Sequence, residues 1–273
     1  MAEPVRKMPA DWETASSSPN DDPFFYGYRL RCVRLPSGEE IEQQIPLTPE
    51  DLLDPQPGDV VGQSGPHHKL LHLLVSLLTG YYASRDDVLV TSDMKMLWGI
   101  PGLSEPAPDA AVIPYVRDKG AERDSFDVVQ EGTRPCLVLE VVSSKDAETR
   151  RNDYDKKVEI YQRVGISEYL ILDPPTVRTK QRLLLTGYRL GIDGRYRQIA
   201  PDAEGRLLSQ TTQLLFSVAE DGCTLRVLDA ATGEPLLAPE EVAEAWKAAE
   251  ERASAAEAEN ARLRAELERL RNS

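Results

Sequence analysis

The stretch CLVLEVV, residues 136–142, decides how this chain folds, because a run of apolar residues of this length is typical of a β-strand buried on both faces. One carboxylate, Glu140, stands in its middle. Carboxylates are almost never fully buried unless they are paired. The stretch therefore predicts a core strand that carries an unusual acid.

A lysine downstream has an equally unusual setting. The residues three, four and seven positions after Lys157 are apolar: Ile160, Tyr161 and Val164. On a helix these positions share one face, so Lys157 is predicted to point toward the core. A buried ammonium group is costly unless an anion meets it. The neighbouring Lys156 has acids within one turn and is expected to be the more solvated of the two lysines.

A second acid, Asp109, follows Pro108 and opens the apolar run of residues 110–113. Two acids on core strands and one lysine on a core-facing helix are the parts of a metal-dependent phosphodiesterase site. Mg²⁺ prefers oxygen ligands, usually one or two carboxylates with waters and substrate phosphate. We expect Asp109 and Glu140 to bind Mg²⁺, for which Mn²⁺ can substitute, with the Val141 backbone carbonyl as a third protein ligand. Lys157 is expected to orient or deprotonate the attacking water.

Other roles for these residues remain open. Lys157 and Glu140 can form a buried structural salt bridge with no part in a reaction. Asp153 stands four residues before Lys157, so the two can also form an exposed pair on the helix surface. Asp109 can simply cap a turn.

Taken together in order, these segments are similar to the Uma2 family, a restriction-endonuclease-like group in the PD-(D/E)XK nuclease superfamily. The resemblance covers roughly residues 24 to 200 and is carried by PD at 108–109, LEVVSS at 139–144, ND and KKVEIY at 152–161, VGISEY at 164–169 and LDP at 172–174. It implies an α/β core with a mixed sheet, dependence on Mg²⁺, and DNA as the substrate. The superfamily usually has its lysine two residues after the glutamate, where this chain has Val142. Lys157 is the matching lysine, and it can act only if its helix packs over strand 136–142 and it faces Glu140.

Three further residues are candidates for accessory roles in the site. His68 matches a recurrent histidine of the family and begins an amphipathic helix. Asp59 can add a carboxylate, although its place beside Gly58 also fits a turn. Asp153 is the third candidate. We expect His67 and His72 to be structural.

The remaining chain favours an α/β fold of the restriction-endonuclease-like kind, with a mixed β-sheet flanked by helices. We divide it into a disordered segment at 1–22, a nuclease-like domain at 23–237 and a C-terminal helix at 238–273. Strands are predicted at 24–35, 40–47, 87–98, 109–116, 136–142 and 168–172, helices at 66–82 and 147–164, and short strands between 177 and 227. Residues 119–133 are predicted to be a surface connection.

The C-terminal helix has apolar residues at alternating spacings of four and three: Val242, Trp246, Ala249, Ala253, Ala256, then Leu263, Leu267 and Leu270 after Asn260. Such heptads, with a single asparagine at an a position, favour a parallel two-stranded coiled coil. A solvated, charged single helix is the alternative. We therefore expect a homodimer formed through residues 240–271.

Composition limits the compartment and the partners. The 273 residues contain three widely spaced cysteines without a zinc-like pattern, no run apolar enough for a membrane span, and no secretory signal, so we expect a cytoplasmic protein. The formal net charge of −14 argues against indiscriminate binding to nucleic acid. Two functions follow: an Mg²⁺-dependent DNA endonuclease, or an inactive nuclease fold that binds or assembles through its C-terminal coiled coil. The complete set of Asp109, Glu140 and Lys157 favours the enzyme.

Overall fold

A six-stranded mixed sheet forms the centre of the computed structural model, which describes residues 22–34, 40–61, 65–143, 147–176 and 179–271. Its strand order is β11-β10-β9-β8-β6-β4. Of its strand pairs within the described residues, β8–β9 is parallel and the others are antiparallel. The strands are β4 (Val88–Thr91), β6 (Ala110–Pro114), β8 (Leu137–Val141), β9 (Glu168–Asp173), β10 (Leu184–Leu190) and β11 (Tyr196–Gln198).

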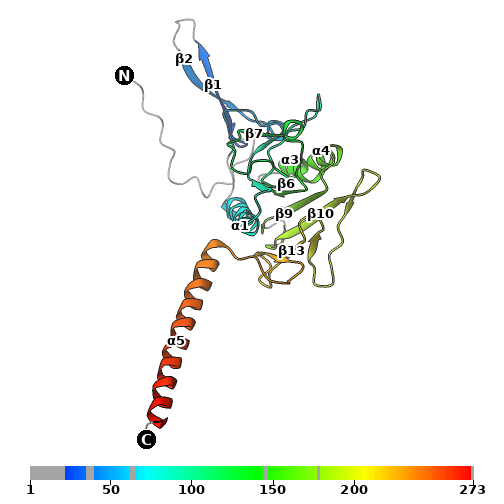
Figure 1. The fold of residues 1–273 in the computed structure, drawn as a ribbon. Coiled ribbons are helices and arrows are strands. Elements are labelled where there is room, and N and C mark those ends of the chain that lie inside the picture. Colours follow the sequence, from blue (N-terminus) through cyan, green and yellow to red (C-terminus); the bar gives the residue numbers. More distant parts are fainter. Residues whose placement is uncertain (1–21, 35–39, 62–64, 144–146, 177–178, 272–273) are drawn as a thin grey trace.

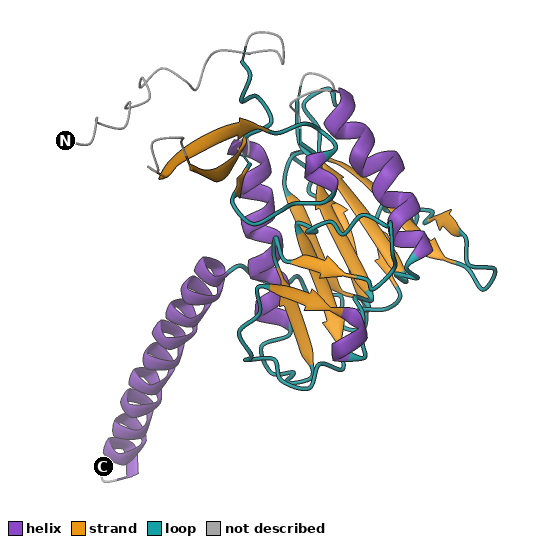
Figure 2. Cartoon of the chain, turned by 90° about the horizontal axis from the view of Figure 1, so that it is seen from above, coloured by secondary structure: helices purple, strands orange, loops and turns teal. Residues whose placement is uncertain are grey.

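The two faces of this sheet are covered by different elements (Figures 1 and 2). Helix α1 (Gly65–Tyr81) packs on one face, in a core shared with the small sheet of β12 (Leu207–Ser209), β13 (Leu214–Val218) and β14 (Leu225–Asp229). Helix α4 (Lys157–Arg163) packs on the other face. Because side chains alternate along a strand, Leu139 joins the first core and Val138 the second. Glu140 lies two residues after Val138 and therefore points to the same face of the sheet, toward α4.

The helix predicted at 147–164 contains a wider turn in its middle. It consists of α3 (Ala147–Arg151), the π-helical turn η2 (Asn152–Lys156) and α4. The backbone N–H of Lys157 donates to the carbonyl of Asn152, five residues earlier. The helical segment ends as predicted at Gly165, whose φ of +77° is a conformation that glycine adopts without strain.

Two predicted segments differ from the structure. The single strand expected at 87–98 is divided between β4 and β5 (Lys95–Leu97), which belong to different sheets, because the chain turns at Asp93, where φ is +51°. Residues 119–133 are not merely a surface connection. They contain β7 (Ser125–Asp127), which pairs with β5, and α2 (Val128–Glu131); Phe126 of β7 is fully buried.

The N-terminal part of the described chain forms a β-ribbon that projects from the domain (Figure 1). Its elements are β1 (Tyr28–Arg34), β2 (Glu40–Pro46) and β3 (Asp59–Val60), with the single 3₁₀ turn η1 (Asp51–Leu53) between β2 and β3. The predicted disordered segment at 1–22 lies outside the described residues except for Asp22.

Helix α5 (Pro239–Arg271) extends away from the domain, with Trp246, Leu263 and Leu267 exposed (Figure 1). Whether it forms a coiled coil stays a prediction. Among the described helices, none is long and apolar enough to cross a membrane.

Candidate active site

Asp109 and Glu140 lie opposite each other on neighbouring strands. The antiparallel register pairs Ala110 of β6 with Leu139 of β8, so the next pair outward is Asp109 with Glu140. Residues directly opposite each other point to the same face of a sheet. The acids are in contact through the backbone as well: the Asp109 N–H lies 3.5 Å from Glu140 Oε2. Strand pairing alone therefore brings together two acids that are 31 residues apart in the sequence.

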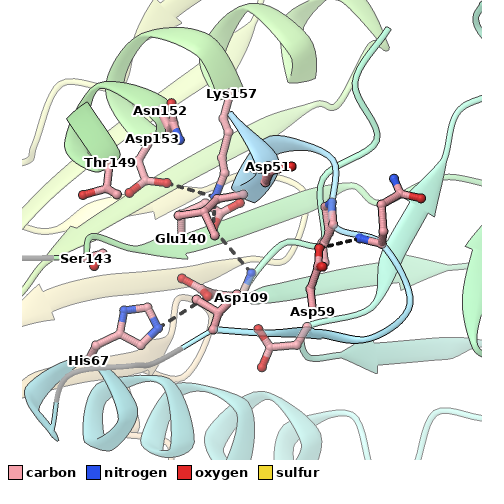
Figure 3. Close-up of a pocket in the computed structure, with 16 residues that line it drawn as sticks. Asp51, Asp59, His67, Asp109, Glu140, Ser143, Thr149, Asn152, Asp153 and Lys157 are labelled. Atoms are coloured by element: carbon pink, nitrogen blue, oxygen red, sulfur yellow. Dashed lines mark hydrogen bonds and ion pairs between the residues drawn. The ribbon is translucent and has the colours of Figure 1, made fainter. Parts of the chain in front are cut away.

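Lys157 reaches this pair from the covering helix (Figure 3). Its Nζ lies 2.8 Å from Glu140 Oε2 and 2.9 Å from Asp153 Oδ1, and its side chain is 11% exposed. Burial alone would lower the pKa of Lys157, but the nearby carboxylates of Asp153, Glu140 and Asp109 outweigh it and raise that pKa. Lys157 is therefore a protonated cation at neutral pH. Its pair with Asp153 is buried, and the alternative of an exposed surface pair is wrong.

Glu140 is 1% exposed and has a partner on each oxygen. The Tyr161 hydroxyl donates to Oε1 at 2.7 Å, and Lys157 occupies Oε2. Burial and the charges of Asp109 and Asp153 raise the pKa of Glu140 to about 8, against the attraction of Lys157. Three carboxylates thus compete for one ammonium group, and the cluster favours either a bound proton or additional positive charge.

Asp109 is held by a backbone amide and a histidine. The Val141 N–H donates to Oδ2 at 2.6 Å, and Nε2 of His67 lies 3.5 Å from Oδ1. Burial would raise the pKa of Asp109, but His67 and then Lys157 lower it below its usual range. Asp109 thus belongs to the charged cluster and does not merely cap a turn.

His67, which we expected to be structural, is the histidine that contacts the site. His68, the predicted accessory residue, is exposed and does not line the pocket described below. The spacing of apolar residues in the sequence could have distinguished His67 from His68. The buried residues of α1 are Leu70, Leu71, Leu74, Leu77 and Leu78, and this stripe extends back by three residues to 67 rather than to 68.

Asp59 lies in the wall of the pocket but is already paired. Arg29 donates to both of its carboxylate oxygens, at 2.5 and 2.9 Å. Burial favours a raised pKa for Asp59, yet the bonds from Arg29 and the Gln56 amide hold that pKa below its ordinary value. Asp59 therefore ties β3 to β1 at the base of the β-ribbon.

The side chains of the charged cluster line one pocket with a volume of about 350 Å³: Asp59, His67, Asp109, Glu140, Asp153 and Lys157. Sequence reasoning gave no site role to six of its polar lining residues, which come from loops and from short or irregular helical segments: Asp51, Gln56, Asp93, Ser143, Thr149 and Asn152. Their side chains belong to no regular stripe, so no periodic pattern identifies them. Six of the lining residues are acidic, and Lys157 and His67 are the basic ones.

The donor set is suitable for one hard cation. Within the described residues there is no group of three or more His, Cys, Asp or Glu side chains arranged to hold a metal ion. Mg²⁺, however, is usually bound through one or two carboxylates, and waters and substrate phosphate supply the remaining ligands. The adjacent carboxylates of Asp109 and Glu140, in a cluster with excess negative charge, fit that pattern.

A mixed α/β fold with two acids on paired strands and a lysine on the covering helix defines a restriction-endonuclease-like protein. The chain belongs to the Uma2 family, described as "Putative restriction endonuclease", whose family model matches residues 51–221. This confirms the resemblance seen in the sequence. A crystal structure of "a putative nuclease belonging to DUF820 from Anabaena variabilis ATCC 29413" is similar at 15% identity and a TM-score of 0.37, covering 63% of this chain and 78% of that one. The comparison with curated proteins gave no match.

Proposed function

We propose that this protein is a divalent-cation-dependent endonuclease that hydrolyses phosphodiester bonds in DNA. The observation that carries the proposal is the convergence of Asp109, Glu140 and Lys157 in one buried cluster that opens into a pocket. Membership in a family of restriction-endonuclease-like proteins supports the same reaction class.

In this proposal Asp109 and Glu140 hold Mg²⁺ or Mn²⁺. In a β-strand, the N–H and C=O of one residue point to the same edge of the strand. The Val141 N–H donates to Asp109, so the Val141 carbonyl faces the same side. In this proposal it is the third protein ligand. The cation, when bound, neutralises phosphate charge and lowers the pKa of its water. Lys157, protonated and fixed by Asp153, stabilises negative charge that develops on the phosphate.

The acidic pocket explains why a cation is needed. A phosphodiester carries negative charge, and the pocket wall includes Asp109, Glu140 and Asp153, whereas Lys157 and His67 are the basic side chains that line it. Without added cations the pocket repels its substrate. We infer that cation binding precedes DNA binding.

The experiment is hydrolysis of supercoiled plasmid by the full chain, in Mg²⁺, in Mn²⁺ and in excess chelator. Nicked or linear DNA should form only with a divalent cation. A folded protein that converts neither plasmid nor a mixed-sequence oligonucleotide in either metal would contradict the proposal. A parallel single-stranded RNA substrate determines whether DNA is the preferred polymer.

We further propose that α5 joins two chains in a homodimer through residues 240–271. The supporting observation is the exposure of its heptad residues Trp246, Leu263, Leu267 and Leu270. The same helix supports the second candidate function, an inactive nuclease fold used for assembly. We place the protein in the cytoplasm, because Cys32, Cys136 and Cys223 are all free thiols.

A further inference from the structure

The β-ribbon of β1 and β2 has two faces that differ in charge. Residues directly opposite each other on antiparallel strands point to the same face, so the register assigns each side chain to one of the two. One face, which we call the pocket face, carries Arg29, Arg31, Val33, Ile41, Gln43 and Ile45. It contains two arginines and no acid, whereas the other face contains Glu40 and Glu42 with one arginine, Arg34. In a chain with a formal net charge of −14, a basic face of this kind is a local exception.

The base of the ribbon shows that this face lies on the side of the pocket. Asp59 of β3 is directly opposite Arg29, so it points to the same face, and it lines the pocket (Figure 3). Arg29 is also close to a second lining residue, because its Nη2 lies 3.5 Å from Asp51 Oδ1. Arg31 stands two residues further out, about 7 Å along the strand. The pocket face therefore continues from the pocket lining along the ribbon.

The outer part of the pocket face is open to solvent. Arg31 lies directly opposite Gln43, and both side chains are exposed. Neither side chain forms a hydrogen bond or an ion pair with another described residue. The fold therefore leaves both side chains available to a ligand.

Duplex DNA has the shape and the charge that fit this face. The ribbon projects from the domain (Figure 1), and the major groove, about 12 Å wide, admits a two-stranded β-ribbon. In that groove arginine binds guanine and glutamine binds adenine, each through two hydrogen bonds, and apolar side chains contact the thymine methyl group. The pocket face presents Arg31 and Gln43 with the apolar Val33 and Ile41 beside them.

We propose that the pocket face of the β-ribbon binds duplex DNA in the major groove, with Arg31 and Gln43 at the base edges. This inference rests on the proposed nuclease function and adds to it an element that determines sequence preference. Because the same face includes Asp59 of the pocket lining, DNA held there lies beside the pocket that receives the cation.

The test is the affinity of the full chain for a short fluorescent duplex of randomised sequence, measured by anisotropy in Ca²⁺, which takes oxygen ligands as Mg²⁺ does. Arg31→Gln/Gln43→Ala alters the pocket face. Arg34→Gln/Gln44→Ala is the matched control, because it makes the same chemical change at exposed positions on the opposite face of the same two strands. The first variant should bind about 10-fold more weakly and the control like the wild type, with all melting temperatures equal. Equal losses in the two variants, or no loss in the first, would overturn the proposal.

Two further measurements test the groove and the occupant. A duplex whose cytosines carry glucosylated hydroxymethyl groups has a filled major groove, and the wild type should bind it about 10-fold more weakly than the plain duplex. Equal affinity for the two duplexes would overturn the placement in the major groove. A lower mass of Arg31→Gln/Gln43→Ala in light scattering, with unchanged affinity for DNA, would make the face an interface between copies and overturn the proposal.

These binding measurements are independent of cleavage. A wild type that binds duplex DNA through the pocket face but cuts none in Mg²⁺ or Mn²⁺ would refute the proposed nuclease function and support the DNA-binding surface. A wild type that cuts DNA while Arg31→Gln/Gln43→Ala binds and cuts equally well would support the nuclease and refute the surface.

Discussion

At the scale of single residues, the charge balance of the cluster decides its chemistry. Asp109, Glu140 and Asp153 surround Lys157, and both Glu140 and Asp153 have raised pKa values because burial penalises their charged forms. A cluster built only for stability would match charges more evenly, since unpaired buried charges are costly. The excess of acid instead supports the divalent cation that we propose for this site.

The raised pKa of Glu140 predicts how stability depends on pH in the absence of metal. Between the ordinary value of 4.5 and about 8, the folded protein holds a proton that the unfolded chain has lost. Stability should therefore fall as pH rises through this window, by about 1.4 kcal/mol per pH unit at most. Glu140→Gln should flatten the dependence, and the exposed control Glu159→Gln should not. Urea unfolding in the presence of chelator, from pH 5.5 to 8.5, measures the free energy of unfolding at each pH. If this free energy changes with pH equally in the wild type and in Glu140→Gln, the pH dependence does not come from Glu140.

The site could be predicted in part from single residues. Glu140 and Lys157 stand out in the sequence because each is a charge among apolar neighbours, and the structure brings them into contact. Asp153 was predicted only as an accessory residue, because an acid four residues before a lysine is common on exposed helices. Asn152 belongs to the motifs that carry the family resemblance, but its burial depends on a π-helical turn that no sequence pattern predicted.

At the scale of elements, helix α1 places one histidine at the site and turns its neighbour to solvent. His67→Gln should lower the cleavage rate about 10- to 100-fold, because a group that orients a metal ligand is lost beside Asp109. His68→Gln is the matched control, one residue along the same helix, and should leave cleavage unchanged. Plasmid cleavage rates measure both. Equal losses, or a loss only in His68→Gln, would remove α1 from the site.

Elements with strong periodicity were predictable, and short or irregular ones were not. The apolar run of β8 and the apolar stripe of α4 identify both elements. Strand β7 contains three residues with a single buried side chain, Phe126, which is too short for alternation to appear. The break between β4 and β5 depends on the left-handed backbone of Asp93, and the apolar residues before Thr91 and after Asp93 led us to predict one continuous strand.

At the scale of the whole molecule, α5 predicts the state of association. A helix with Trp246, Leu263 and Leu267 exposed gains stability by burying them against a second copy. Light scattering of the full chain should give twice the monomer mass, and a chain ending at Ala238 should give the monomer mass. A monomeric full-length chain would remove the coiled coil, and the assembly function with it.

The central claim is that the buried Glu140–Lys157 pair acts in hydrolysis and is not only a structural salt bridge. Removing one partner of a buried pair costs about 3–5 kcal/mol, so loss of cleavage in Lys157→Met alone leaves both explanations open. The double variant Glu140→Gln/Lys157→Met removes both members of the pair and should be more stable than Lys157→Met, although Asp153 still loses its partner.

The most direct measurement is therefore the rate of plasmid cleavage in Mg²⁺, with the melting temperature, for the wild type, Lys157→Met and the double variant. Lys156→Met, which changes the adjacent and more exposed lysine, is the control and should resemble the wild type. We expect the double variant to melt at a higher temperature than Lys157→Met and to cut no DNA. A double variant that cleaves at the wild-type rate would contradict the account and leave the pair a structural one.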